Sequence, residues 1–318
     1  MTSVKSAARH VELRGIAWDH TRAMGPLSVT AQIFADLHDG CRVTWDRRSL
    51  WAFGEEPIDE LASRYDLIVL DHPMIGEAVE RGLLIPLDAH GSRKWIHEQR
   101  SQTVGASHAS YAWENQVWAA AIDAACPVAA GRADLLAKEQ WTFPETWEEV
   151  LALARETGRV ALPLKPIDAL SLFFSLCANQ GYGLMETETG TLVDPDLGVH
   201  ALAQIQEILS AINSDCLGLN PIDLLNKMSS SRDVIYSPHV FGYSNYGRVG
   251  YAPNRIAFGN FVGPGEVPHA GVTLGGAGLA VSAATAHVDE ALRYATWVSG
   301  AECQSSTMCL QAVSPAVP

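Results

Sequence analysis

Polar side chains that could hold a small ligand follow two predicted strands of this chain. The first group follows the strand at residues 11–18 and comprises Trp18, Asp19, His20 and Arg22. The second group, Asp71 and His72, follows the apolar strand at residues 66–70. Open α/β sheets bind their ligands at the carboxyl ends of such strands. Both groups therefore predict a small-molecule site at one edge of a sheet.

Further candidates lie elsewhere along the chain. Asp123 ends a predicted strand, and Trp51 lies in a predicted loop. The remaining candidates come from two segments, FGYSNYGRVGY and TLGGAG, and are Tyr243, Asn245, Tyr246, Gly275 and Gly276. Carboxylates, imidazoles and amides exchange hydrogen bonds with hydroxyl groups, and aromatic faces cover the apolar side of a sugar ring. Glycines let the backbone approach a ligand closely.

Several of these residues have a structural alternative. Trp18 could pack in the core, His72 could cap the following helix, and Arg22 could be a surface charge or could clamp the carboxylate of a sugar acid. Asp71 and Asp123 are stronger candidates, because an acidic residue at a strand end has no packing reason to be there.

Catalytic chemistry is not indicated by the motifs. The pairs Asp19-His20 and Asp71-His72 would suit a divalent metal and leave a metal-dependent hydrolase as an alternative, but no H-x-H or H-E-x-x-H spacing occurs. No G-x-S-x-G nucleophile elbow, P-loop or complete dinucleotide fingerprint is present. We expect no enzyme activity, no metal and no cofactor.

The pattern of elements predicts an α/β fold. Strand–helix alternation over the first part of the chain predicts a parallel sheet, with a helix opening at Pro26. The region from residue 123 onward reads as mostly helical, and the last helix is predicted over residues 288–298. We expect one lobe from residues 1–122 with 275–318, and a helix-rich second lobe from residues 123–274.

Composition excludes some partners. The formal charge of −14 argues against nucleic acid, which requires clustered Lys and Arg, and an acidic surface is typical of a soluble monomer. No run of 18 apolar residues predicts a transmembrane helix. Six scattered cysteines show no metal or redox spacing, and a disulfide between Cys303 and Cys309 has no support in the pattern.

Four segments together carry a family resemblance. They are YDLIVLDHPMIGEAVERGLLIPLD (65–88), WAAAIDAACPVAAGRADLL (118–136), FPETWEEVLALARE (143–156) and GVTLGGAGLAVSAATAHVDEALRYATWVSGAECQ (271–304). In order and spacing the chain resembles the extracellular solute-binding proteins of ABC importers, in the branch that handles sugars.

The resemblance implies a two-lobed periplasmic-binding-protein-like fold with hinge crossings. It implies that a sugar-like solute binds between the lobes, closes them, and is delivered to the membrane subunits of an ABC transporter outside the cytoplasm. Family members continue beyond the equivalent of Pro318, so we expect the C-terminal part to be truncated. The N-terminal MTSVKSAARH lacks the apolar run of a secretory signal, so we expect either that a signal has been removed or that the protein stays in the cytoplasm. A cytoplasmic small-molecule sensor on the same scaffold is therefore the alternative function.

Overall fold

The computed structural model describes residues 10–38, 40–91, 93–181, 192–212, 214–264 and 271–308. Backbone contacts divide the chain into two compact units. The first unit joins residues 1–124 to residues 275–318, and the second comprises residues 125–274. That these units act as separately moving lobes stays a prediction.

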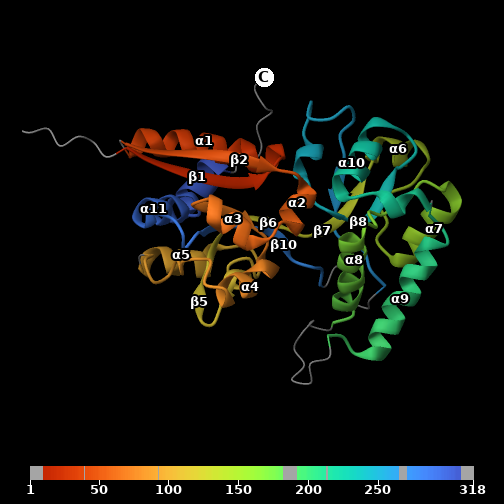
Figure 1. The fold of residues 1–318 in the computed structure, drawn as a ribbon. Helices are drawn as coiled ribbons and strands as arrows, with labels where there is room; N and C mark the ends of the chain where they lie inside the picture. The colour runs from red at the N-terminus through yellow and green to blue at the C-terminus, as the bar shows by residue number, and fades with distance from the viewer. Residues whose placement is uncertain are drawn as a thin grey trace, which may run out of the picture. The chain divides into compact units, whose positions relative to one another are not determined.

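A five-stranded sheet forms the centre of the first unit (Figure 1). Its strands, in spatial order, are β2 (Cys41–Arg48), β1 (Val11–Trp18), β3 (Leu67–Leu70), β10 (Gly275–Val281) and β6 (Ala119–Ala125). The helices of this unit are α1 (Thr21–Leu37), α2 (Leu50–Glu55), α3 (Ile58–Arg64), α4 (Ile75–Glu80), α5 (Arg93–Gln102), α11 (Val288–Val298) and α12 (Ala301–Cys303). Shorter elements are the 3₁₀ turns His72–Met74 and Ala109–Tyr111, the hairpin β4 (Ala112–Trp113) and β5 (Gln116–Val117), and the π-turn Gln304–Met308.

The sheet is mixed, which corrects the prediction of a parallel sheet. β1 runs parallel to β2 and to β3, as strand–helix alternation predicts. β10 pairs antiparallel with β3. The chain reaches β10 after its long course through the second unit, not through a helical crossover, so no βαβ connection fixes the direction of that strand.

Helices cover both faces of this sheet because successive side chains of a strand point to opposite faces. Leu67 and Val69 of β3 belong to the apolar cluster that includes residues of α1 and α11. Ile68 and Leu70 belong to a separate cluster with residues of α3 and α4. All four side chains are fully buried, which explains why this segment reads as a continuous apolar run.

Two predicted boundaries near the candidate site are wrong. The first helix starts at Thr21 and contains Pro26, because the side chain of His20 caps it one turn earlier than the proline signal suggests. Trp51 lies in α2, not in a loop, because the Ser49 hydroxyl accepts a hydrogen bond from the Ala52 amide and caps that helix.

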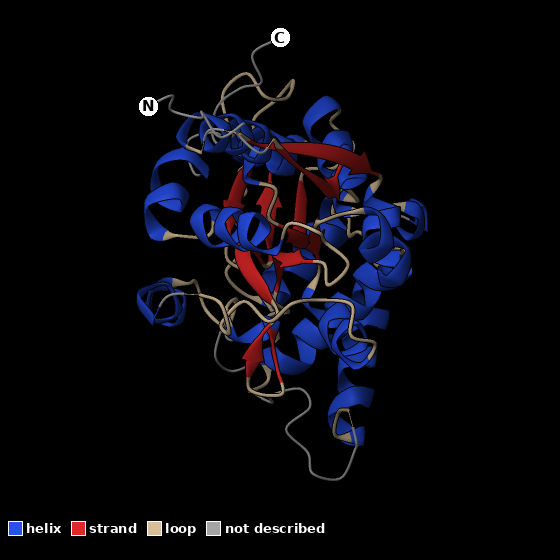
Figure 2. Ribbon diagram, turned by 60° about the vertical axis from the view of Figure 1, so that its left-hand side comes forward, coloured by secondary structure: helices blue, strands red, loops and turns tan. Residues whose placement is uncertain are grey.

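The second unit contains a smaller sheet, whose strands β7 and β8 are labelled in Figure 1, together with several helices; Figure 2 distinguishes strands from helices by colour. In its sheet, β7 (Pro127–Gly131) pairs antiparallel with both β8 (Tyr236–Phe241) and β9 (Ala257–Gly259). The helices are α6 (Ala133–Lys138), α7 (Trp147–Thr157), α8 (Pro166–Asn179), α9 (Pro195–Leu209) and α10 (Pro221–Ser230), with 3₁₀ turns at Ser214–Gly218 and Ser244–Gly247. One large apolar cluster joins these elements.

The described cysteines carry free thiols, and Cys126 alone among them is exposed. Cys309 lies outside the described residues, so the structure does not test the disulfide with Cys303 that the sequence analysis considered. Over the ranges given above, no helix is both long and apolar enough to cross a membrane.

Candidate functional site

The turn between β1 and α1 positions the first group of candidate residues. His20 Nδ1 accepts a hydrogen bond from the Arg22 amide at 3.1 Å, so the imidazole serves as the N-cap of α1. Burial, reinforced by the charge of Arg22, lowers the pKa of His20 to about 4, against a smaller opposing effect of Asp19. The ring is therefore neutral at pH 7. Asp19 is more exposed and pairs with Arg47 at 3.3 Å.

Arg22 and Asp123 form a two-point ion pair within the first unit. Arg22 Nε lies 2.9 Å from Asp123 Oδ1, and Nη2 lies 2.6 Å from Oδ2. Both side chains are largely buried, with exposed fractions of 11% and 23%. Such parallel bonds are the strong form of an arginine–carboxylate contact. The pair fastens the start of α1 to the end of β6.

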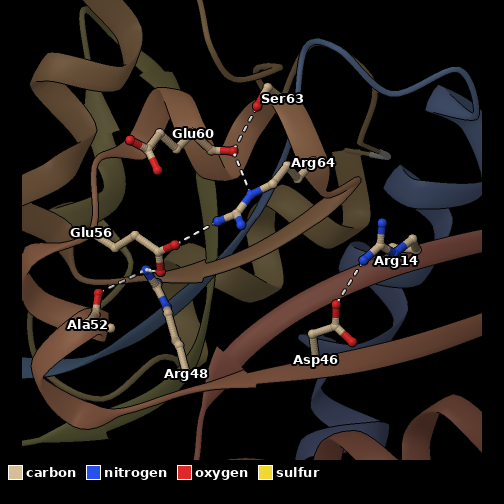
Figure 3. Close-up of polar contacts among 8 residues, drawn as sticks. All are labelled: Arg14, Asp46, Arg48, Ala52, Glu56, Glu60, Ser63 and Arg64. Atoms are coloured by element: carbon tan, nitrogen blue, oxygen red, sulfur yellow. Dashed lines mark hydrogen bonds and ion pairs between the residues drawn. The ribbon is translucent and has the colours of Figure 1, made fainter.

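A second arginine, which the sequence reading missed, lies at the end of β2. Arg48 Nη2 donates to the Val69 carbonyl at 2.7 Å. Its Nη1 donates to the Ala52 carbonyl at 3.3 Å and lies 3.8 Å from Glu56 Oε2 (Figure 3). Its guanidinium also lies 4.9 Å from the centre of the Phe53 ring. The helix α2 therefore holds a buried positive charge beside the end of β3.

Asp71 leaves the end of β3 next to that charge. Its side chain is half-buried, and no hydrogen bond to it occurs within the part of the chain that is described. Burial raises the pKa of Asp71 to about 7; Arg48 opposes this change, and the nearby Asp123 carboxylate adds to it. Asp71 and Asp123, 52 positions apart in sequence, thus lie close enough to repel one another.

Tyr111 completes the group and was also missed. Its pKa is raised by burial and then by the charges of Asp71 and Asp123, so the phenol lies within electrostatic range of both carboxylates. The His72 ring meets the Tyr111 ring edge to face, with centroids 6.3 Å apart, and burial lowers the pKa of His72. A Cβ atom on Gly278 would lie 2.5 Å from the Tyr111 ring, so this strand position needs glycine.

We call Asp71, His72, Tyr111 and Asp123 the acidic cluster. Gly276 supports it from β10: its φ is +121°, and a Cβ atom there would overlap the Asp123 carbonyl oxygen. Gly275, half-buried, starts the same strand. Gly276 thus allows two backbones to approach closely. Ligand contacts by Gly275 and Gly276 stay a prediction.

The other predicted residues lie in different surroundings. Trp18 is buried at 6% exposure and packs on Phe53 with ring centroids 5.1 Å apart, whereas Trp51 is 76% exposed. The second-unit candidates are Tyr243, Asn245 and Tyr246, and all three are buried. Tyr243 and Tyr246 belong to the core of that unit, and the Tyr246 hydroxyl donates to Asn226 Oδ1 at 2.8 Å. Ligand contacts by these residues stay predictions.

Metal binding would require several ligands at one point. Among the residues that the structure describes, no three His, Cys, Asp or Glu side chains gather in a way that could hold a metal ion. Asp19 turns to Arg47 and His20 caps α1, so the two Asp-His pairs do not converge.

A family model for bacterial extracellular solute-binding proteins matches residues 59–318. No curated protein matches the chain in sequence. The matching solved structures show a common fold at low sequence identity.

Three of these structures illustrate the likeness. A tagatose-bound ABC transporter solute-binding protein of Thermotoga lettingae superposes with a TM-score of 0.79 at 14% identity, covering 96% of this chain and 81% of that one. The GacH receptor of Streptomyces glaucescens, solved unliganded and with acarbose, superposes with a TM-score of 0.77 at 16% identity, covering 96% of this chain and 79% of that one. An ABC transporter solute-binding protein of Agrobacterium radiobacter in complex with ribitol superposes with a TM-score of 0.76 at 14% identity, covering 96% of this chain and 80% of that one.

Proposed function

Because the chain belongs to the bacterial extracellular solute-binding proteins, we propose that it binds a small uncharged polyhydroxy solute, a sugar or polyol, through the acidic cluster. The observation that carries the proposal is Asp71. Its carboxyl group is half-buried, has no hydrogen-bond partner in the described structure, and lies within electrostatic range of Tyr111 and Asp123. A solute hydroxyl that donates to Asp71 would supply the missing bond.

The charges at the acidic cluster favour a neutral solute. Arg22 already donates two hydrogen bonds to Asp123, so a sugar acid would have to compete with that carboxylate for the guanidinium. Arg48 is held by two backbone carbonyls and lies beside Asp71. Arg22 is thus paired with Asp123, Arg48 lies near Asp71 and Glu56, and a charged solute would have to compete with these contacts.

The chemistry of the family and of its structural neighbours supports the same class. The neighbours described above were solved with tagatose, acarbose and ribitol, which are all rich in hydroxyl groups. The family model describes extracellular solute-binding proteins, and the tagatose and ribitol complexes are of solute-binding proteins of ABC transporters. We therefore assign the protein to solute capture outside the cytoplasm and delivery to importer membrane subunits; closure of the lobes on the solute and a monomeric state remain predictions.

A thermal-shift screen tests this function. The panel holds neutral sugars and alditols, sugar acids, and quaternary amines, each at several concentrations. A ligand at about 100 times its dissociation constant adds roughly 2.7 kcal/mol to native stability, so a binder gives a clear shift. Shifts confined to neutral polyhydroxy compounds support the proposal, whereas a larger shift with an acid or an amine would overturn it.

A further inference from the structure

Asp168 in the second unit is a buried acid that the proposed function leaves unexplained. It lies in the first turn of α8, whose N-cap residue is Lys165, and it is 5% exposed. Aspartate is almost never buried to this degree in proteins unless it is paired. The carboxyl group of Asp168 therefore requires a partner.

No partner for this carboxyl group is present within the described structure. Neither oxygen makes a hydrogen bond there, and Lys165, whose charge acts on Asp168, forms its ion pair with Asp223 at 3.4 Å. Both oxygens nevertheless keep some accessible surface, in contrast to Asn245 Oδ1, which is fully buried without a partner. A ligand can therefore reach Asp168, and buried polar groups are nearly always paired in native structures.

Ser171 lies three residues further along α8, on the same side of the helix as Asp168. It is 8% exposed, and its Oγ lies 2.6 Å from Thr273 Oγ1. That contact uses one position of a hydroxyl that has one donor and two acceptor positions, so Ser171 can take a second partner. Because Cβ atoms at this spacing are about 5–6 Å apart, one ligand hydroxyl can bond to both side chains.

A chain of hydrogen bonds holds Ser171 in place. Ser175 Oγ lies 3.4 Å from Thr273 Oγ1 and accepts from the Thr273 amide at 3.2 Å. The same Ser175 atom lies 3.0 Å from His239 Nε2. Burial lowers the pKa of His239 to about 3, so the chain is uncharged at neutral pH. The Ser171 hydroxyl is thus positioned before a ligand arrives, which reduces the entropic cost of binding.

The charges around Asp168 favour a neutral ligand group. Burial raises the pKa of Asp168 to about 7; Lys165 opposes this change, and Asp223 adds to it. Near pH 7 the group is therefore about half protonated and offers a cation only a partial counterion. An anion would meet the negative charges of Asp168 and Asp223. A hydroxyl group suits the position, because it can donate to Asp168 and bond to Ser171 as well.

We propose that Asp168 and Ser171 form a hydroxyl-binding site of the second unit, which takes one hydroxyl group of a neutral sugar or polyol. This inference rests on the proposed function for its ligand class. It does not rest on the acidic cluster, because Asp168 and Ser171 belong to the other unit.

The proposal is tested by calorimetric titration of the intact protein with ribitol, D-glucose and maltose as neutral probes and choline as a cationic probe. With the neutral probe that binds the wild type most tightly, Asp168→Ala should weaken binding at least tenfold, because it removes the acceptor. Asp168→Asn keeps one acceptor oxygen in the same shape and should recover part of the loss. Choline binding more tightly than all three neutral probes would overturn the assigned ligand class.

Further variants separate binding from structure. Ser171→Ala should weaken binding of the same probe about fivefold. Asp196→Ala alters an exposed carboxyl group on α9 of the same unit and serves as the control, with wild-type affinity expected. Asp168→Ala should not lower the midpoint of urea denaturation, because the carboxyl group makes no hydrogen bond in the described structure. Wild-type affinity in both Asp168→Ala and Ser171→Ala, as expected if the site holds water alone, would overturn the proposal.

This site and the acidic cluster can fail separately. Binding that is lost in Asp71→Asn but kept in Asp168→Ala would refute the second-unit site and leave the proposed function intact. Binding that is lost in Asp168→Ala but kept in Asp71→Asn would support the second-unit site and contradict the acidic cluster. A wild type that binds none of the three neutral probes would contradict both.

Discussion

Arg22 at the start of α1 donates two hydrogen bonds, of 2.9 and 2.6 Å, to the carboxylate of Asp123 near the end of β6. The two residues are 101 positions apart. Their pairing joins the beginning of the first unit to the strand from which the chain enters the second unit. Arg22 also provides the counterion for Asp123, whose charge acts on the nearby Asp71 and Tyr111.

Removal of Arg22 should be costly, because it leaves a largely buried carboxylate without its partner. We expect Arg22→Ala to lower the free energy of unfolding by roughly 2–4 kcal/mol in urea titrations. The control is Arg47→Ala, which breaks an exposed pair with Asp19 and should cost less than about 1 kcal/mol. Equal losses in the two variants would show that the Arg22–Asp123 pair contributes no more than a surface contact.

Asp71 should make stability depend on pH in a defined direction. Its pKa rises from 3.8 to about 7 on folding, so the folded protein keeps a proton that the unfolded chain releases in that interval. The stabilisation of the folded state by this proton is complete below about pH 4 and is lost as the pH rises towards 7.

The comparison with Asp71→Asn isolates this effect from other titrating groups, because asparagine resembles the protonated acid at every pH. Between pH 4 and 7 the variant should gain roughly 1–3 kcal/mol in unfolding free energy relative to the wild type. A pH titration of the Asp71 carboxyl carbon by NMR gives the pKa directly. A midpoint near 4 would contradict the buried position of this group.

His20 should stabilise the protein mainly as a helix cap. Because its Nδ1 accepts from the Arg22 amide, His20→Ala removes the cap and should cost about 1 kcal/mol. His20→Asn keeps a side-chain acceptor and should recover most of the loss, as measured by urea denaturation. An asparagine variant no more stable than the alanine variant would assign the effect to packing of the ring.

Gly276 should tolerate no side chain. Its φ of +121° and the overlap of a Cβ atom with the Asp123 carbonyl predict that Gly276→Ala lowers the free energy of unfolding by about 2 kcal/mol or more. Gly54 in α2 has open space around it, so Gly54→Ala should be neutral or stabilising. Thermal unfolding of both variants measures this difference in stability. Equal stability of the two variants would show that β10 can shift away from β6 to make room for the added methyl group.

The sequence could predict the elements whose signals are local. The strand 11–18 and the helix 288–298 have the predicted bounds, because apolar spacing determines both. The sequence indicates Asp71 and Asp123 as candidates because Asp71 follows a buried strand and Asp123 lies near the end of another, and their ligand contacts stay predictions. Arg48 and Tyr111 carry no such local signal: they reach the site only through the packing of α2 and the turn before β4.

The direction of β10 is also a tertiary property. The glycine-rich segment at 275–281 predicts close backbone approach, but only its pairing with β3 sets it antiparallel.

Calorimetric titration of the wild type, Asp71→Asn and Tyr111→Phe tests the central claim most directly, with the neutral sugar or alditol that gives the largest thermal shift. Asp59→Asn, which alters an exposed carboxylate paired with Arg81, serves as the control. We predict that Asp71→Asn and Tyr111→Phe each weaken binding at least tenfold while the control binds like the wild type. Wild-type affinity in both cluster variants would contradict the assignment of the acidic cluster as the solute site.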